Sequence, residues 1–289
     1  MRKILTQSTP RLRRYAHALL GRWPVAPDER TGRPRPNQDA DDLAHQALLG
    51  VWRDGCETME AAAGARLWLG LCRRVTDLGR AHLAGADESE DVGRRHAERQ
   101  THFAWAPESR ALPLMPFDLR ALLALVILER LNYQQAGEVL DMPGETALAR
   151  LAVARARFAS LLSGEDRPHL LAVATKADKP SCHSVTEGDL HRHVDDLLDP
   201  CRRAEIRLFL EARGDAARRT EEWRRHAERL RQAFEPLLRE PLPLSLDFSA
   251  QASQLQFRQY VEKRRSLFAG LAPWRAPAAG GPDSAPRIS

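Results

Sequence analysis

Three arginines near the middle of the chain, Arg150, Arg155 and Arg157, are of a residue type that binds phosphate. A guanidinium group offers a planar set of donors to phosphate oxygens. The arginines lie within YQQAGEVLDMPGETALARLAVARARF, residues 133 to 158, a pattern typical of two short helices joined by a tight turn. In helix–turn–helix proteins the second helix lies in the major groove, with its N-terminal residues at base edges. An ordinary αα-hairpin has the same spacing, so the pattern alone leaves DNA binding and bundle packing open.

The helices that would position these arginines follow from apolar spacing and turn residues. Residues 117–131, FDLRALLALVILERL, predict an apolar helix that is buried on most sides. A short helix over residues 133–139 leads into a turn at Asp141, because aspartate tolerates the left-handed backbone conformation required there. Pro143 then introduces a second helix over about residues 145–161. We expect that helix to expose the three arginines and to bury Leu148 and Leu151.

The run MPFDLRALLALVILERLNYQQAGEVLDMPGETALARLAVARAR, residues 115 to 157, resembles region 4 of the extracytoplasmic-function (ECF) sigma factors. Their pattern is LP.DLR followed by Y.E.A..LG.P.GTV.SRL.RAR. The resemblance implies that the chain binds core RNA polymerase and promoter DNA, with DNA-binding residues Gln134, Gln135, Glu145, Thr146, Arg150, Arg155 and Arg157. Glu145, Ala149 and Val153 stand where such a helix could carry hydrogen-bond donors. A glutamate there repels phosphate, although it can accept from a cytosine amino group.

The N-terminal runs RLRRYAHALLG and DADDLAHQALLGVW, the latter at residues 39 to 52, resemble sigma region 2. The second run is an amphipathic helix whose acidic opening lies at the positive end of the helix dipole. Its carboxylates can therefore serve helix capping, a partner contact, or both. The resemblance implies a polymerase-binding face made of Asp39, Asp41, Asp42, Leu43, Gln46, Leu49 and Trp52.

The run ARLWLGLCRRVTDLGRAH, residues 65 to 82, resembles the promoter-melting helix of the same family. Basic residues along a helix suit the capture of single-stranded DNA by charge and stacking. The resemblance adds Arg73, Arg74 and Arg80 to the DNA-binding residues. Val75 departs from the family, which commonly has asparagine at this position.

A third run, TEGDLHRHVDDLLDPCRRAEIRLFLEARGDAARRTEEWRRHAERLRQAFEPLLREPLPLSL, residues 186 to 246, resembles the cytoplasmic domain of anti-sigma factors. It predicts helices over about residues 187–197 and 215–238, with another between them that Asp199 caps and Pro200 begins. Apolar stripes on a charged surface suit a small bundle that docks on another surface. The residues expected to dock on the rest of the chain are Leu190, Val194, Leu198, Trp223, Leu230 and Phe234.

Many anti-sigma domains of this kind bind zinc through a histidine and a following H...C..C motif, whereas the equivalent stretch here contains no cysteine. Cys182, His183, His191, His193 and Cys201 could in principle supply nitrogen and sulfur ligands. They lack paired short spacing, so we expect no metal and no cofactor. The sequence also lacks a Gly-rich phosphate loop, a nucleophile elbow and HExxH, and we expect no enzyme activity.

Helical spacing throughout predicts an all-α protein of 289 residues. We expect a region 2-like first block at 1–83, a linker at 84–112 and a region 4-like second block at 113–163. A second linker at 164–185, an anti-sigma-like third block at 186–246, and a short helix with a poorly folding tail at 247–289 follow.

The net charge of +5 permits a nucleic-acid partner without requiring one. The sequence has no apolar run of membrane-spanning length, its N-terminus lacks a signal-peptide pattern, and its four cysteines are scattered. We therefore expect a cytoplasmic protein without membrane contact. The expected function is that of an ECF sigma factor regulated in cis by contact between the third block and the first two. The alternative is a degenerate sigma-like protein that binds polymerase or an anti-sigma partner without directing initiation.

Overall fold

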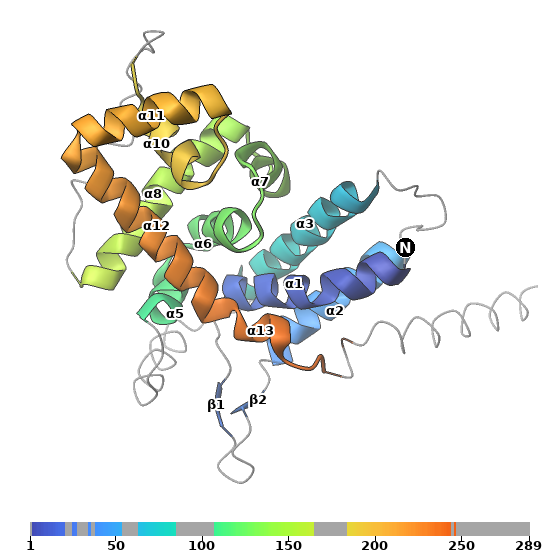
Figure 1. The fold of residues 1–289 in the computed structure, drawn as a ribbon. Helices are drawn as coiled ribbons and strands as arrows, with labels where there is room; N and C mark the ends of the chain where they lie inside the picture. Colours follow the sequence, from blue (N-terminus) through green and yellow to red (C-terminus); the bar gives the residue numbers. More distant parts are fainter. Residues whose placement is uncertain are drawn as a thin grey trace, which may run out of the picture. The chain divides into compact units, whose positions relative to one another are not determined.

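Helices account for nearly all of the chain that the structure describes. The structure is a computed structural model, and it describes residues 2–20, 25–27, 34–35, 38–53, 63–84, 107–164, 184–243 and 246 (Figure 1). Two short strands, β1 (Val25–Pro27) and β2 (Pro34–Arg35), pair antiparallel within the first block. The predicted all-α class is confirmed. None of the described helices is long and apolar enough to cross a membrane.

The first block is built from three long helices, α1 (Arg2–Leu20), α2 (Gln38–Arg53) and α3 (Ala63–Ala84). Each of them contacts the other two. Leu12, Leu48 and Leu71 are fully buried or nearly so between them. The hydroxyl groups of Tyr15 and Thr76 are 2.8 Å apart in the same core and tie α1 to α3.

The second block consists of α6 (Phe117–Leu123), η5 (Ala124–Leu128), α7 (Tyr133–Leu140) and α8 (Gly144–Ser163). It is preceded by α5 (Pro107–Ala111), which lies where a linker was predicted, and by η4 (Leu112–Leu114) at the predicted boundary. The single helix predicted over residues 117–131 is wrong beyond Leu123. The backbone widens there into a π-helix, in which the Glu129 amide donates to the Ala124 carbonyl (3.1 Å), and Arg130 ends it with φ of 57°.

The turn between α7 and α8 follows the sequence prediction closely. Asn132 and Gln135 form a capping box at the start of α7, and Asp141 adopts the left-handed conformation (φ 59°) at its end. Pro143 is the N-cap of α8, as expected. The turn is so tight that a Cβ on Gly137 would lie 2.4 Å from the Met142 carbonyl oxygen, so only glycine fits at this position.

The third block contains α10 (Glu187–Val194), α11 (Pro200–Ala212), α12 (Gly214–Phe234) and α13 (Pro236–Arg239). The predicted cap is confirmed, because the Asp199 side chain accepts from the Arg202 amide and Pro200 begins α11. α10 ends at Val194 rather than at residue 197, and the residue after its C-cap, Asp196, has φ of 60°. The block has its own small core of Leu190, Leu198, Ile206 and Ala216.

The three blocks contact one another within a single unit spanning residues 1–248. α10 lies against α8, α12 crosses α5 and η5, and α13 reaches α1 (Figure 1). α1 contacts η5 and α6, and α3 contacts α7. The third block therefore touches both of the blocks that precede it.

Candidate nucleic-acid interface and its cover

Arg155 of α8 lies at the centre of the contact between the second and third blocks. Its side chain is only 4% exposed and forms an ion pair with Asp195, which follows α10 directly and is 7% exposed. A second guanidinium nitrogen, Nη1, lies 2.7 Å from Nδ1 of His191. The prediction that Arg155 faces solvent is wrong. The physical reason is that the end of α10 supplies a carboxylate that compensates the buried charge.

Asp195 binds both helices of the helix–turn–helix. Besides pairing with Arg155, it accepts a hydrogen bond of 2.6 Å from the hydroxyl group of Tyr133, the first residue of α7. Burial and the neighbouring Asp195 carboxylate raise the pKa of Tyr133 well above its usual value, so the phenol stays protonated and donates. One carboxylate of the third block thus holds α7 and α8 together.

A stacked pair of rings closes the other side of Arg155. The buried imidazole of His191 stacks on the indole of Trp223 from α12, with ring centroids 4.2 Å apart and planes at 22°. Because a guanidinium can only donate, Nδ1 of His191 accepts from Arg155. Burial, and then the charges of Arg155 and Arg219, lower the pKa of His191 well below its usual value. The ring is therefore neutral at pH 7.

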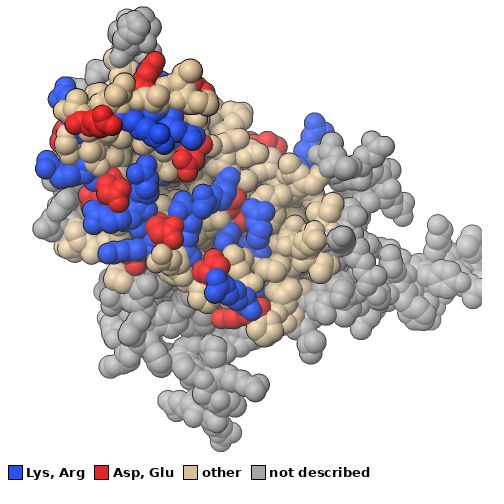
Figure 2. Space-filling view, in the orientation of Figure 1, with Lys and Arg blue, Asp and Glu red and all other residues tan. Residues whose placement is uncertain are grey.

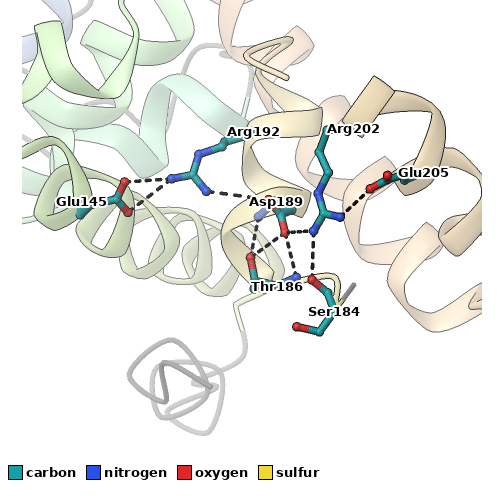
Figure 3. A network of polar contacts seen from close by, with 7 residues as sticks. All are labelled: Glu145, Ser184, Thr186, Asp189, Arg192, Arg202 and Glu205. Carbon is teal, nitrogen blue, oxygen red and sulfur yellow. Dashed lines mark hydrogen bonds and ion pairs between the residues drawn. The ribbon is translucent and has the colours of Figure 1, made fainter. Parts of the chain in front are cut away.

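The rim of this contact is ionic and more exposed (Figure 3). Arg192 of α10 donates to both carboxylate oxygens of Glu145 at 3.0 and 3.3 Å, and its other terminal nitrogen lies 3.9 Å from Asp189. Arg202 also pairs with Asp189, at 2.7 Å. Glu145 is 83% exposed, so this rim pair stabilises the contact by at most about 1 kcal/mol. The buried Arg155–Asp195 pair contributes more to the stability of the contact than this exposed pair does.

The remaining predicted DNA-binding residues of this motif lie on the other side of α8 or on α7. Gln134, Thr146 and Arg150 are exposed, and Gln135 and Arg157 are half-buried. Gln135 is engaged in the cap of α7. The third block therefore covers one side of α8, the helix predicted to enter the major groove, and leaves the opposite side accessible.

The predicted docking residues divide between this contact and the interior of the third block. Trp223 lies at the contact, because the Arg155 guanidinium lies over its ring at 6.0 Å from the centroid. Leu190 and Leu198 belong to the small core of the third block itself. Val194, Leu230 and Phe234 are buried as well.

The exposed face of the third block does not form a phosphate-binding patch. Figure 2 shows basic and acidic side chains interspersed over the face that carries α11 and α12. Along α12, arginines pair with glutamates one turn away, as in Arg224–Glu221 (3.4 Å) and Arg231–Glu228 (3.1 Å). Such alternating charge is typical of a solvated helix face.

The acidic opening of α2 differs from its prediction as a polymerase-binding surface. Asp41 is buried and accepts from Nε of Arg13 at 2.8 Å and pairs with Nε2 of His17 at 3.1 Å. Burial opposes ionisation, but the hydrogen bonds from His17 and Arg13 outweigh it and lower the pKa of Asp41 below its usual value. Arg13 also pairs with Glu240 of the third block at 3.1 Å. Asp41 is thus a buried structural carboxylate in this state.

The other predicted polymerase-binding residues vary in exposure. Asp42 and Gln46 are exposed, Asp39 and Leu49 are half-buried, and Leu43 is buried. The side chain of Trp52 lies outside the described part of the structure. A polymerase surface could reach only the exposed members without a rearrangement of α2.

Two of the predicted DNA-binding arginines of α3 form ion pairs with residues of the second block. Arg73 pairs with Asp141 of the helix–turn–helix turn at 3.2 Å, and Arg80 pairs with Asp118 of α6 at 3.2 Å. Arg74 is half-buried and Val75 is fully buried. The structure therefore brings the two predicted DNA-binding surfaces against each other, which the sequence did not indicate.

The structure describes only some of the cysteines and histidines that were considered as metal ligands. Cys182 and His183 lie outside the described residues, His191 is buried, and Cys201 is exposed. Within the described ranges, no group of three or more His, Cys, Asp or Glu side chains is placed to hold a metal ion.

Sequence reasoning missed three groups that carry the contacts between blocks, namely Asp195, Tyr133 and Glu129. Asp195 had a detectable signal, because it is a carboxylate just past a predicted docking helix while the second block offers arginines. Glu129 had a weaker signal, since it directly follows the apolar run ALLALVIL. Tyr133 had none beyond its place at the start of α7. Searches of protein-family models, of curated proteins and of solved structures found no match to this chain.

Proposed function

We propose that the chain is an RNA polymerase sigma factor of the ECF type whose third block holds the helix–turn–helix in a closed state. The proposal rests on the motif resemblance of the first two blocks and on one observation in particular. Arg155, a predicted phosphate-binding residue, is buried against Asp195 of the third block. A DNA-binding arginine that is paired internally cannot at the same time bind a phosphate.

The covalent connection between the blocks favours this mode of control. A tethered domain experiences an effective concentration on the order of millimolar, so a contact of modest intrinsic strength is enough to keep it bound. The second and third blocks meet through the buried Arg155–Asp195 ion pair, the hydrogen bond from Tyr133 to Asp195 and an exposed ionic rim. Arg231 of α12 also donates to the Ile127 carbonyl. Such a contact can be held by the tether and still be opened by a partner.

Reconstitution with core RNA polymerase tests the proposal. Promoter-directed run-off transcription from a genomic pool would be measured for the full chain and for a truncation that ends at Gly164. We expect the truncated chain to initiate transcription and the full chain to give less run-off product. Absence of initiation from both chains on every promoter contradicts the sigma assignment, whereas equal activity contradicts inhibition by the third block.

A regulatory protein that binds polymerase or an anti-sigma partner without directing initiation is the second candidate. Two observations favour it. Val75 is fully buried, so it cannot contact DNA where the family commonly has asparagine. Glu145, at the front of α8, is engaged by Arg192. Stable binding to core polymerase without run-off product from either chain would support this candidate.

A further inference from the structure

Glu129 joins the first and second blocks through a buried ionic cluster. Its side chain has no exposed surface, and one carboxylate oxygen accepts from Nε and Nη2 of Arg14 at 3.0 and 2.8 Å. The other oxygen accepts from Nε of Arg11 at 3.1 Å. Both arginines lie on α1, so a single carboxylate of the second block is held by two cations of the first.

The backbone around Glu129 is irregular on both sides. The π-helix η5 precedes it, and Arg130 follows with φ of 57°. Two carbonyl groups of this segment point toward α1, because Nη2 of Arg14 donates to the Leu128 oxygen (2.6 Å) and Nη2 of Arg11 to the Glu129 oxygen (3.1 Å). Single-turn π-helices and left-handed non-glycine residues are concentrated at functional segments, where the surrounding contacts maintain the strain.

The described hydrogen bonds of this cluster come from the first two blocks alone. None of the hydrogen bonds described for Glu129 comes from residues 184–246, and the third block meets the same segment through Arg231, which donates to the Ile127 carbonyl (3.2 Å). Arg120 adds a second link between the first two blocks, since it donates to the Leu19 carbonyl at 2.8 Å. Displacement of the third block would therefore leave α1 attached to η5.

We infer that Glu129, Arg11 and Arg14 form a second lock, which holds the first and second blocks together independently of the third block. The closed state then has two locks, and opening one leaves the other shut. As a mode of regulation, this inference rests on the proposed function. In the closed state the arginines of α3 also pair with the second block. Displacement of the third block therefore frees Arg155, while separation of α3 from the second block is left to the binding of core polymerase.

A buried ionic cluster can hold two blocks together and still be separated, because burial of its charges costs free energy. Burial raises the pKa of Glu129 above its usual value, and the two arginines oppose that shift only in part. The ionised carboxylate is therefore kept in the interior at a desolvation cost. Buried ion pairs often hold a contact less tightly than apolar residues of similar volume, while loss of one partner weakens it strongly.

Amide hydrogen exchange of four full-length chains tests the inference: the wild type, Asp195→Asn, Glu129→Gln and the double variant. Asp195→Asn should speed exchange in α10 while α1 and η5 stay protected. Glu129→Gln should speed exchange in α1 and η5 on the order of 100-fold, because one partner of a buried pair is lost, and should leave α10 protected. The double variant should show both changes.

Two further variants separate a local lock from general misfolding. Glu138→Gln makes the same substitution at an exposed residue of α7 and should leave exchange unchanged. Arg11→Gln removes the half-exposed arm of the cluster (44% exposed) and should give a smaller increase confined to α1 and η5. The inference is overturned if Asp195→Asn alone deprotects α1 and η5 as much as the double variant does, or if Glu129→Gln changes nothing. Run-off failure together with the expected exchange pattern would instead overturn the proposed function alone.

Discussion

Substitution of Asp195 by asparagine should weaken the contact between the second and third blocks strongly. The variant leaves the Arg155 cation in a site where the side chain is only 4% exposed, and it also weakens the acceptor of the Tyr133 hydroxyl. Loss of one partner of a buried ion pair destabilises a protein by on the order of 3–5 kcal/mol. Because asparagine keeps one acceptor oxygen, we expect the lower end of that range, about 3 kcal/mol.

Urea unfolding followed by circular dichroism measures this effect. With a urea dependence of about 2–3 kcal/mol/M, the midpoint should fall by about 1–1.5 M. Asp196→Asn is the matched control, because Asp196 is the next residue, is exposed and has φ of 60°, a conformation that asparagine tolerates. Its midpoint should stay near that of the wild type. Equal midpoints for the two variants would refute the reasoning that Asp195 neutralises a buried charge.

Three further predictions concern the same surface. Because the pKa of His191 is lowered in the folded state, the unfolded chain takes up the proton first, and stability should fall as the pH drops below about 6.5. A smaller fall of the urea midpoint in His191→Gln would verify this. Tyr133→Phe should destabilise the chain by about 1.5–3 kcal/mol, the contribution of a hydrogen bond to a charged acceptor, as measured by the same unfolding assay. In duplex DNA binding by the full chain, Arg150→Gln and Arg157→Gln should each lower the slope of log affinity against log salt by about 1, whereas Arg155→Gln should leave that slope unchanged.

Features set by local chemistry were predictable from the sequence. Asp141 and Pro143 define the turn of the helix–turn–helix, and Asp199 with Pro200 defines the start of α11, because caps and left-handed positions depend on a few neighbouring residues. The all-α class follows from apolar spacing over whole segments.

Features set by long-range packing were not predictable. Helical spacing predicted that Arg155 faces solvent. Spacing within one helix cannot show that the Asp195 carboxylate, 40 residues later in the chain, pairs with it. Asp41 looked like part of an exposed acidic helix start, yet it is buried against α1, where Arg13 and His17 form hydrogen bonds with it. The α-helix gives way to the π-helix after Leu123, where η5 contacts α1. The apolar run 117–131 has no periodic signal of this change.

Cleavage of the chain between the second and third blocks tests the central claim most directly. A protease site would be placed within residues 165–183, and run-off transcription would be measured for cut and uncut full-length chains over a range of dilutions. If the third block holds the helix–turn–helix closed through its tether, initiation by the cut chain should rise on dilution while the uncut chain stays weak at every concentration. Equal run-off from cut and uncut chains at all dilutions would contradict the account.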